Sequence, residues 1–377
     1  GLNAFFAYTV VLGMGYTYGQ ALVIVFISGI FFIVITAIGL RQAIIRSIPD
    51  AVKTAITPGI GLFITIIGLK NAGIVIANPA TLVSLVDFSQ WKAEGADMAL
   101  INGALVALLG LVTMGILHAR KVKGSILLGI VAATLIGIPL GITHISNLDM
   151  NIAVKFQDFA EVSFMKMDFA GLFAGGNFIE TLFTVTMLVI SFSLVNMFDS
   201  IGTLLGAAKQ SGMIDENGEV IHMKQALMSD AISTAAGAMV GTSTVTTVVE
   251  SSAGIAAGGR TGLTSLVTAV MFLAAIIFVP VVSIIPAAAT APALIFVGIL
   301  MLGNIRDVDF SDMSNALPAF CTIVFMPFTY SIANGVAFGL ITYCLMKLTT
   351  GRKQDVKVLT LMISAVFIVR YAFMTLG

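Results

Sequence analysis

The feature that most limits what this chain can fold into is a series of apolar runs of membrane-spanning length. Only 10% of its 377 residues are charged, against roughly 25% in soluble domains, so too little polar surface exists to coat a soluble fold. The bilayer must therefore be the solvent, and helices that satisfy their own backbone are the structure it allows. The runs are 19–40, 58–77, 98–118, 124–143, 178–200, 261–285, 289–303, 317–333 and 335–349.

Weaker stretches complete this pattern. Residues 1–12 and 242–258 are apolar but short and rich in small residues, and 225–240 is a weak span. The final apolar run, 358–376, contains an arginine and fits either a span or an interfacial helix. It makes up most of a C-terminal segment, 350–377.

The positive charges predict an orientation in the membrane. Loops on one side hold 14 of the 19 Lys and Arg residues, whereas loops on the other side are acidic. By the positive-inside rule the basic side, which includes residue 1, is cytoplasmic in a multi-pass protein of the plasma (inner) membrane. Net charge is zero, so no attraction to nucleic acid is expected. The basic loops are 41–53, 120–123, 209–224, 260, 304–312 and 347–357, the last including 350–357.

Two parts of the chain follow one plan in opposite directions. Each has a short segment, a full span, an Ile-Pro pair (48–49 or 285–286) and a proline, Pro58 or Pro292, that is expected to open the next span. Inverted repeats with paired broken helices are typical of secondary transporters, whose substrate binds between the repeats near the bilayer midplane. Because two spans precede the second short segment and none precedes the first, we expect the first two spans to be missing from this sequence.

Few ionisable groups fall inside the spans, and such groups are functional candidates because their burial is costly. Asp199 shares a helical face with Asn196, three residues before it. Asp230 lies in the weak span and is either structural or a proton carrier. Glu250 joins a β-branched run to a stretch of small residues, which favours a short strand leading into a half-helix whose N-terminus stabilises the carboxylate.

This set of side chains suits a flat heterocycle. A carboxylate accepts a pair of N–H donors, amides and hydroxyls complete the polar edge, and Phe5 or Phe6 could stack on the ring. No metal spacing and no nucleophile–base pair is present, so we expect neither a metal, a cofactor nor an enzyme. The substrate-binding candidates are Asn3, Phe5, Asn196, Asp199, Glu250 and Ser251, and the proton-coupling candidates are Asp199, Glu250 and Asp230.

Several long motifs carry a family resemblance over essentially the whole chain. They are residues 1–8 (GLNAFFAY), 196–203 (NMFDSIGT), 241–246 (GTSTVT), 250–254 (ESSAG), 258–264 (GGRTGLT) and 326–332 (MPFTYSI). The sequence closely resembles the AzgA-like hypoxanthine/guanine/adenine permeases of the nucleobase–ascorbate transporter (nucleobase:cation symporter) superfamily. The resemblance implies an all-α polytopic membrane protein with a 7+7 inverted-repeat transporter fold, two broken helices and short strands at the midplane.

The resemblance also implies a domain plan and a mechanism. A core domain would comprise 1–57 and 178–288, and a gate domain 58–177 and 289–349. In such proteins the gate domain often mediates a homodimer. Purine nucleobases would enter the cell by proton symport, with an elevator-type movement of the core within the membrane lipid. The family usually has Asp at the position of Asn196, and an amide cannot carry a proton. Proton carriage is therefore expected of Glu250 and Asp199.

Two rival readings remain. The first is an anion transporter of the same fold, such as a sulfate-type carrier. The acidic residues expected at the half-helix ends argue against it, because they would repel an anionic substrate. An intramembrane enzyme or a structural subunit of a membrane complex would be expected to show metal, haem or nucleophile patterns, which this sequence lacks.

Overall fold

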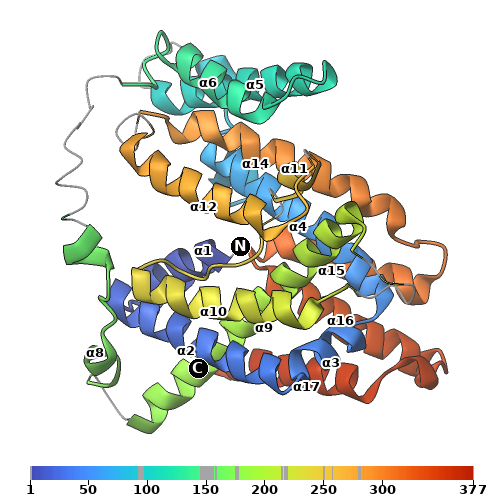
Figure 1. Ribbon diagram of the computed structural model, residues 1–377. Helices are drawn as coiled ribbons and strands as arrows, with labels where there is room; N and C mark the ends of the chain where they lie inside the picture. The colour runs from blue at the N-terminus through green and yellow to red at the C-terminus, as the bar shows by residue number, and fades with distance from the viewer. Residues whose placement is uncertain are drawn as a thin grey trace. The chain divides into compact units, whose positions relative to one another are not determined.

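The computed structural model describes most of the chain, which is predominantly helical (Figure 1). Its contacts divide the chain into two compact units: a first unit of residues 1–59, 154–265 and 305–377, and a second unit of 60–153 and 266–304. The predicted core and gate boundaries remain a prediction. The described residues are 2–91, 97–144, 157, 159–174, 178–213, 215, 220–248, 251–256, 258–278, 282 and 284–376.

The first unit is built from helices that come from both ends and the middle of the chain. Helices α2 and α10 pack along each other, and α9 packs against α2 (Figure 1). The elements are α1 (Leu2–Ala4), η1 (Phe5–Gly13), α2 (Tyr18–Ala37), α3 (Leu40–Ser47), the start of α4 (Asp50–Asn71), η4 (Phe159–Ser163), α8 (Phe169–Phe173), α9 (Phe178–Ser211), α10 (Met223–Val240), α11 (Ser251–Ala256), the start of α12 (Gly262–Ala275), most of η6 (Gly303–Asp307), α15 (Met313–Phe328), α16 (Ile332–Thr349), η7 (Lys353–Asp355) and α17 (Val358–Leu376).

The second unit contains the rest of α4 and α12 and a compact group of apolar helices. Helix α5 packs against α6 and α14, around small buried residues such as Ala104, Ala107 and Ala291. The other elements are β1 (Val75–Asn78), β2 (Leu82–Leu85), η2 (Phe88–Gln90), α5 (Met98–Ala119), α6 (Ser125–Gly137), η5 (Ile276–Phe278) and α14 (Ala287–Leu302). Strands β1 and β2 form an antiparallel hairpin with Val75 opposite Leu85.

Helices α2 and α10 approach closely because small residues meet at their contact. A Cβ atom on Gly29 would lie only 2.7 Å from the backbone nitrogen of Ala235. Small residues allow such close backbone approach between membrane helices, where packing replaces the hydrophobic effect as the driving force.

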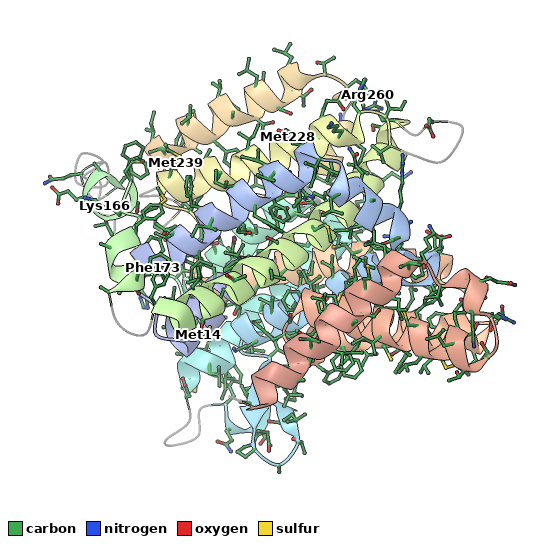
Figure 2. All side chains as sticks on the ribbon, turned by 90° about the horizontal axis from the view of Figure 1, so that it is seen from below. Met14, Lys166, Phe173, Met228, Met239 and Arg260 are labelled. Carbon is green, nitrogen blue, oxygen red and sulfur yellow. The ribbon has the colours of Figure 1, made fainter. Side chains whose placement is uncertain are left out.

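The surface of the molecule suits a bilayer. Among the described residues, four helices are long and apolar enough to cross a membrane, and four shorter apolar helices accompany them. Many large apolar side chains are exposed, Met14 and Met239 among them (Figure 2). The four longer helices are Tyr18–Ala37, Asp50–Asn71, Met98–Ala119 and Ala287–Asp307, and the shorter ones are Ser125–Gly137, Gly262–Phe278, Met313–Phe328 and Val358–Val369.

The expectation that Pro58 and Pro292 open their helices is wrong. Helix α4 begins at Asp50 and α14 at Ala287, each directly after the proline of an Ile-Pro pair, and the later prolines lie inside them. Proline is favoured at a helix start because its missing N–H is not needed there. Within a membrane helix an internal proline is tolerated because neighbouring groups re-satisfy the freed carbonyl.

Two predicted loops and a predicted strand also differ from the structure. The loop 41–53 contains α3 and the start of α4, and α9 continues to Ser211, beyond the predicted end at residue 200. The stretch 242–248, where the sequence favours a strand, has no regular secondary structure. Its polar groups bond to side chains of neighbouring helices instead of to a second strand, as described next.

Candidate functional site

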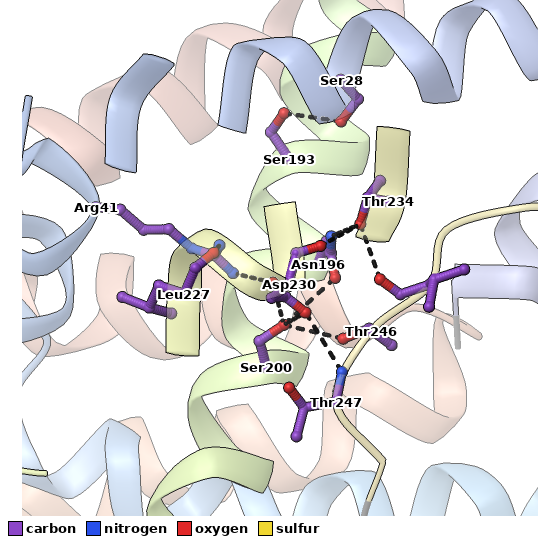
Figure 3. Close-up of polar contacts among 11 residues, drawn as sticks. Ser28, Arg41, Ser193, Asn196, Ser200, Leu227, Asp230, Thr234, Thr246 and Thr247 are labelled. Carbon is purple, nitrogen blue, oxygen red and sulfur yellow. Dashed lines mark hydrogen bonds and ion pairs between the residues drawn. The ribbon is translucent and has the colours of Figure 1, made fainter. Parts of the chain in front are cut away.

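A fully buried ion pair lies in the first unit. The Arg41 guanidinium on α3 contacts the Asp230 carboxylate on α10 at 2.6 Å, and the two side chains are 0% and 1% exposed (Figure 3). Arg41 was expected in a loop, and the structure instead places it in a helix, with its side chain buried. Gly39, with φ of +76°, turns the chain between α2 and α3 and thereby directs Arg41 back toward α10.

The guanidinium is oriented by two further groups. One of its nitrogens donates to the Leu227 carbonyl at 3.0 Å, and its carbon lies 4.6 Å from the centre of the Phe32 ring. The carbonyl dipole and the ring face both attract a cation, so they stabilise the charge of this buried side chain. The rigid fork of arginine suits this arrangement, since it can donate in two directions at once.

The Asp230 carboxylate accepts from two groups besides Arg41. The Ser200 hydroxyl on α9 lies 2.9 and 3.0 Å from its two oxygens, and the backbone N–H of Thr247 lies 3.3 Å from one of them. A guanidinium, a hydroxyl and an amide thus converge on one buried carboxylate, which is how a buried charge becomes tolerable. The Arg41–Asp230 pair is neutral as a whole.

Hydroxyl groups extend this centre toward Asn196. Ser200 contacts the Thr246 hydroxyl at 2.9 Å. The Asn196 amide, also fully buried, donates to the Thr234 hydroxyl at 3.2 Å, and Thr234 donates to the Val245 carbonyl at 2.8 Å. Asn196 is therefore linked through α10 to the irregular segment after it.

The two short segments of the inverted repeat meet in the first unit. The Ser243 hydroxyl donates to the Asn3 side-chain oxygen at 2.5 Å, although 240 positions separate them, and the Tyr18 hydroxyl donates to the Gly241 carbonyl at 2.5 Å. Hydrogen bonds to side chains of α1, α9 and α10 thus hold residues 243–247, and no strand partner does among the described residues. We call residues 243–247 the tethered segment.

A cavity of about 290 Å³ lies beside the ion pair. Its lining is both polar and apolar, with Asp230 at its wall and three residues of the tethered segment along one side. The lining residues are Leu204, Ala226, Ser229, Asp230, Ser233, Val245, Thr246 and Thr247.

The structure places some of the predicted site residues and leaves others outside its described part. Asn196 belongs to the buried centre, while Asn3 and Ser251 are exposed, Ser251 as the first residue of α11. Glu250 lies outside the described residues, and so do the side chains of Phe5 and Asp199, whose backbones lie in η1 and α9.

Sequence reasoning missed Arg41, Ser200 and Thr234. One signal could have revealed Arg41: it lies at the edge of one apolar run, and the opposite charge of Asp230 lies inside another. Buried charges in membranes are usually paired, so the two could have been matched. Hydroxyl residues on helices give no such signal, since most of them bond to their own helix.

Comparison with known proteins decides the family. A family model described as "Permease family" matches residues 1–338. The chain belongs to this permease family. The permease is 38% identical over 373 residues to the adenine permease AdeP of Escherichia coli (strain K12), covering 99% of this chain and 78% of that protein. It is also 38% identical over 383 residues to the guanine/hypoxanthine permease PbuO of Bacillus subtilis (strain 168), covering 98% and 82%.

A solved structure supports the fold of the permease. The transmembrane domain of a cyanobacterium bicarbonate transporter, BicA, aligns with a TM-score of 0.60 at 18% identity, covering 88% of this chain and 80% of that one. The predicted fold class is thereby confirmed, and so is the resemblance to purine permeases. The permease is a multi-pass membrane protein, and its relatives are transporters rather than enzymes, as predicted.

Proposed function

We propose that this permease carries purine nucleobases, among adenine, guanine and hypoxanthine, across the plasma membrane into the cell. Relatives named as adenine permease and guanine/hypoxanthine permease support this substrate class. The observation that carries the proposal is the bond between Asn3 and Ser243, which brings the two short segments of the inverted repeat together. Transporters of this kind bind their substrate where interrupted helices meet.

The proposed site offers amides and carboxylates to a neutral ring. Glu250, just beyond the tethered segment, accepts two N–H groups of the purine, while Asn3, Asn196, Asp199 and Ser251 provide further polar partners and Phe5 stacks on the ring. The neighbouring Arg41–Asp230 pair has no net charge, so it adds no attraction for an anion. This balance favours a nucleobase over the sulfate-type rival.

Coupling and orientation extend the proposal. Protons, carried by Glu250 or Asp199, neutralise a carboxylate during the passage through the membrane, because a neutral acid is far less costly there than a charged one. The first short segment and the basic loops face the cytoplasm. An elevator-type movement of a core domain against a gate domain, with a homodimer through the gate, would complete the cycle.

Uptake of labelled hypoxanthine by cells that express this permease and lack other purine carriers tests this function. We expect saturable uptake that unlabelled purines inhibit, that sulfate does not, and that a proton uncoupler abolishes. Glu250→Gln should reduce uptake at least about 100-fold, as loss of an essential charged partner does. Glu161→Gln, the same change at an exposed site, is the control. Unchanged uptake in Glu250→Gln, or inhibition by sulfate, would refute the proposal.

A further inference from the structure

The buried Arg41–Asp230 pair has no assigned part in binding the substrate, yet its burial needs a reason. Two charges withdrawn from water are costly, and an apolar pair of similar volume is often more stable. In some proteins such a pair fixes one arrangement of the chain against others. Its contacts therefore indicate what it fixes.

The pair joins three parts of the first unit, of which α3 is distant in sequence from the other two. Arg41 comes from α3, Asp230 from α10, and the backbone N–H of Thr247, which bonds to Asp230, belongs to the tethered segment. Ser200 of α9 makes a second connection between the carboxylate and the tethered segment, since its hydroxyl contacts both Asp230 and the Thr246 hydroxyl. The carboxylate thus accepts a backbone N–H of this segment, as the carbonyl of a neighbouring strand would do in a sheet.

We infer that Arg41 and Asp230 are positioning residues, which hold the tethered segment so that the residues following it are presented to the substrate. Arg41, itself oriented by the Leu227 carbonyl and the Phe32 ring, fixes the carboxylate. The carboxylate in turn fixes the Thr247 amide and, through Ser200, Thr246. This role for Asp230 replaces that of a proton carrier. The link to substrate rests on the proposed function, whereas the hold on the segment does not.

The pair can be dissected because its two charges cancel. Arg41→Met leaves a buried carboxylate without its counter-ion, and Asp230→Asn leaves a buried guanidinium without one. The double variant Arg41→Met/Asp230→Asn restores neutrality, and its amide oxygen can still accept from Thr247 and Ser200. Each single change should therefore release the segment, and the double variant should largely hold it.

Cysteine labelling at Thr244 measures the hold directly. Thr244 is 6% exposed and its hydroxyl bonds to nothing in the described structure, so Thr244→Cys loses no hydrogen bond. In a background with Cys321 and Cys344 replaced by Ala, maleimide should label this cysteine slowly. Each single charge variant should label at least about tenfold faster, and the double variant within about threefold of the parent, because labelling follows local opening.

A second buried position controls for general unfolding. Thr322 on α15 is 0% exposed and outside the network, so Thr322→Cys should label at one rate in every variant. If Thr322→Cys also becomes reactive in a single charge variant, the variant Ser200→Ala decides. It removes the hydroxyl that joins Asp230 to Thr246 and leaves the Arg41–Asp230 ion pair in place. It should therefore speed labelling at residue 244 and leave labelling at residue 322 unchanged. Unchanged labelling at 244 in the single variants, or in Ser200→Ala, would overturn the inference.

Uptake separates positioning from proton carriage. We expect the single variants to raise the KM for hypoxanthine about tenfold, and the double variant to recover uptake with the pH profile and uncoupler sensitivity of the parent. A double variant that holds the segment but loses the pH dependence would show that Asp230 carries the proton, against the inference. Absence of purine uptake in the parent would refute the proposed function, while the labelling results would still stand.

Discussion

At the scale of single residues, the two polar atoms of the Asn196 amide differ in how well they are hydrogen-bonded. Its nitrogen donates to Thr234, but its oxygen lies 3.4 Å from the Ser200 hydroxyl. That hydroxyl has a single proton and lies closer to the charged carboxylate of Asp230, at 2.9 Å. The Asn196 oxygen therefore keeps spare capacity to accept a hydrogen bond, whereas its nitrogen links α9 to α10.

Asn196→Leu should weaken the first unit. The change keeps the side-chain volume close but removes the hydrogen bond from Asn196 to Thr234, and the loss of one buried hydrogen bond costs about 0.5–1.5 kcal/mol. Thermal unfolding in detergent should therefore show a lower midpoint. Thr186→Val is the control on the same helix, because Thr186 is exposed and bonds only to its own helix. Equal midpoints for both variants would contradict the description of Asn196.

The burial and the ion pair of Arg41 could not be predicted from the sequence. It directly follows an apolar run, and a charge at that place ordinarily lies in a loop. Its partner Asp230 is 189 positions away, so only the folded chain reveals the pair. By contrast, the importance of Asn196 was predictable, because a polar side chain deep in an apolar helix needs a partner.

At the scale of elements, apolar length predicted most helices, and local chemistry decided where the prediction failed. Helices α5, α15 and α16 lie within a few residues of their predicted runs, since membrane helices are fixed by the need to bond their own backbone. The hairpin of β1 and β2 was missed because its strands are short and adjoin an apolar span. The segment 242–248 was mistaken for a strand because β-branched residues favour extended chain but do not supply a partner.

The contact between α2 and α10 should be intolerant of even one methyl group. Gly29→Ala would bring a Cβ atom within 2.7 Å of the Ala235 backbone, so the helices must separate, at a cost of about 1–3 kcal/mol typical of overpacking. The measurement is the unfolding midpoint, together with uptake.

Gly115→Ala on α5 is the matched control for this prediction. A Cβ atom there meets nothing within 4 Å, and alanine is the better helix former by roughly 0.8–1 kcal/mol. The midpoint should therefore stay or rise. A Gly29→Ala protein as stable as the Gly115→Ala protein would show that α2 and α10 are not in close contact.

At the scale of the whole molecule, the distribution of basic loops predicts which side of the membrane each loop faces. Lys121→Cys, in a basic loop, and Ser89→Cys, in an acidic one, are both exposed positions. In a background without the two native cysteines, membrane-impermeant maleimide should label residue 89 in intact cells. Residue 121 should be labelled only after permeabilisation. The reverse pattern would invert the proposed orientation.

The most direct test of the central claim is equilibrium binding of labelled hypoxanthine to the purified protein, since binding does not require a complete transport cycle. We expect saturable binding that unlabelled purines displace and that sulfate and bicarbonate do not. Asn3→Ala, which removes the acceptor of the Ser243 bond, should weaken binding at least about tenfold, while Asn71→Ala, at the exposed end of α4, should not. Absence of saturable binding, displacement by sulfate, or full affinity in Asn3→Ala would contradict a purine site where the two short segments meet.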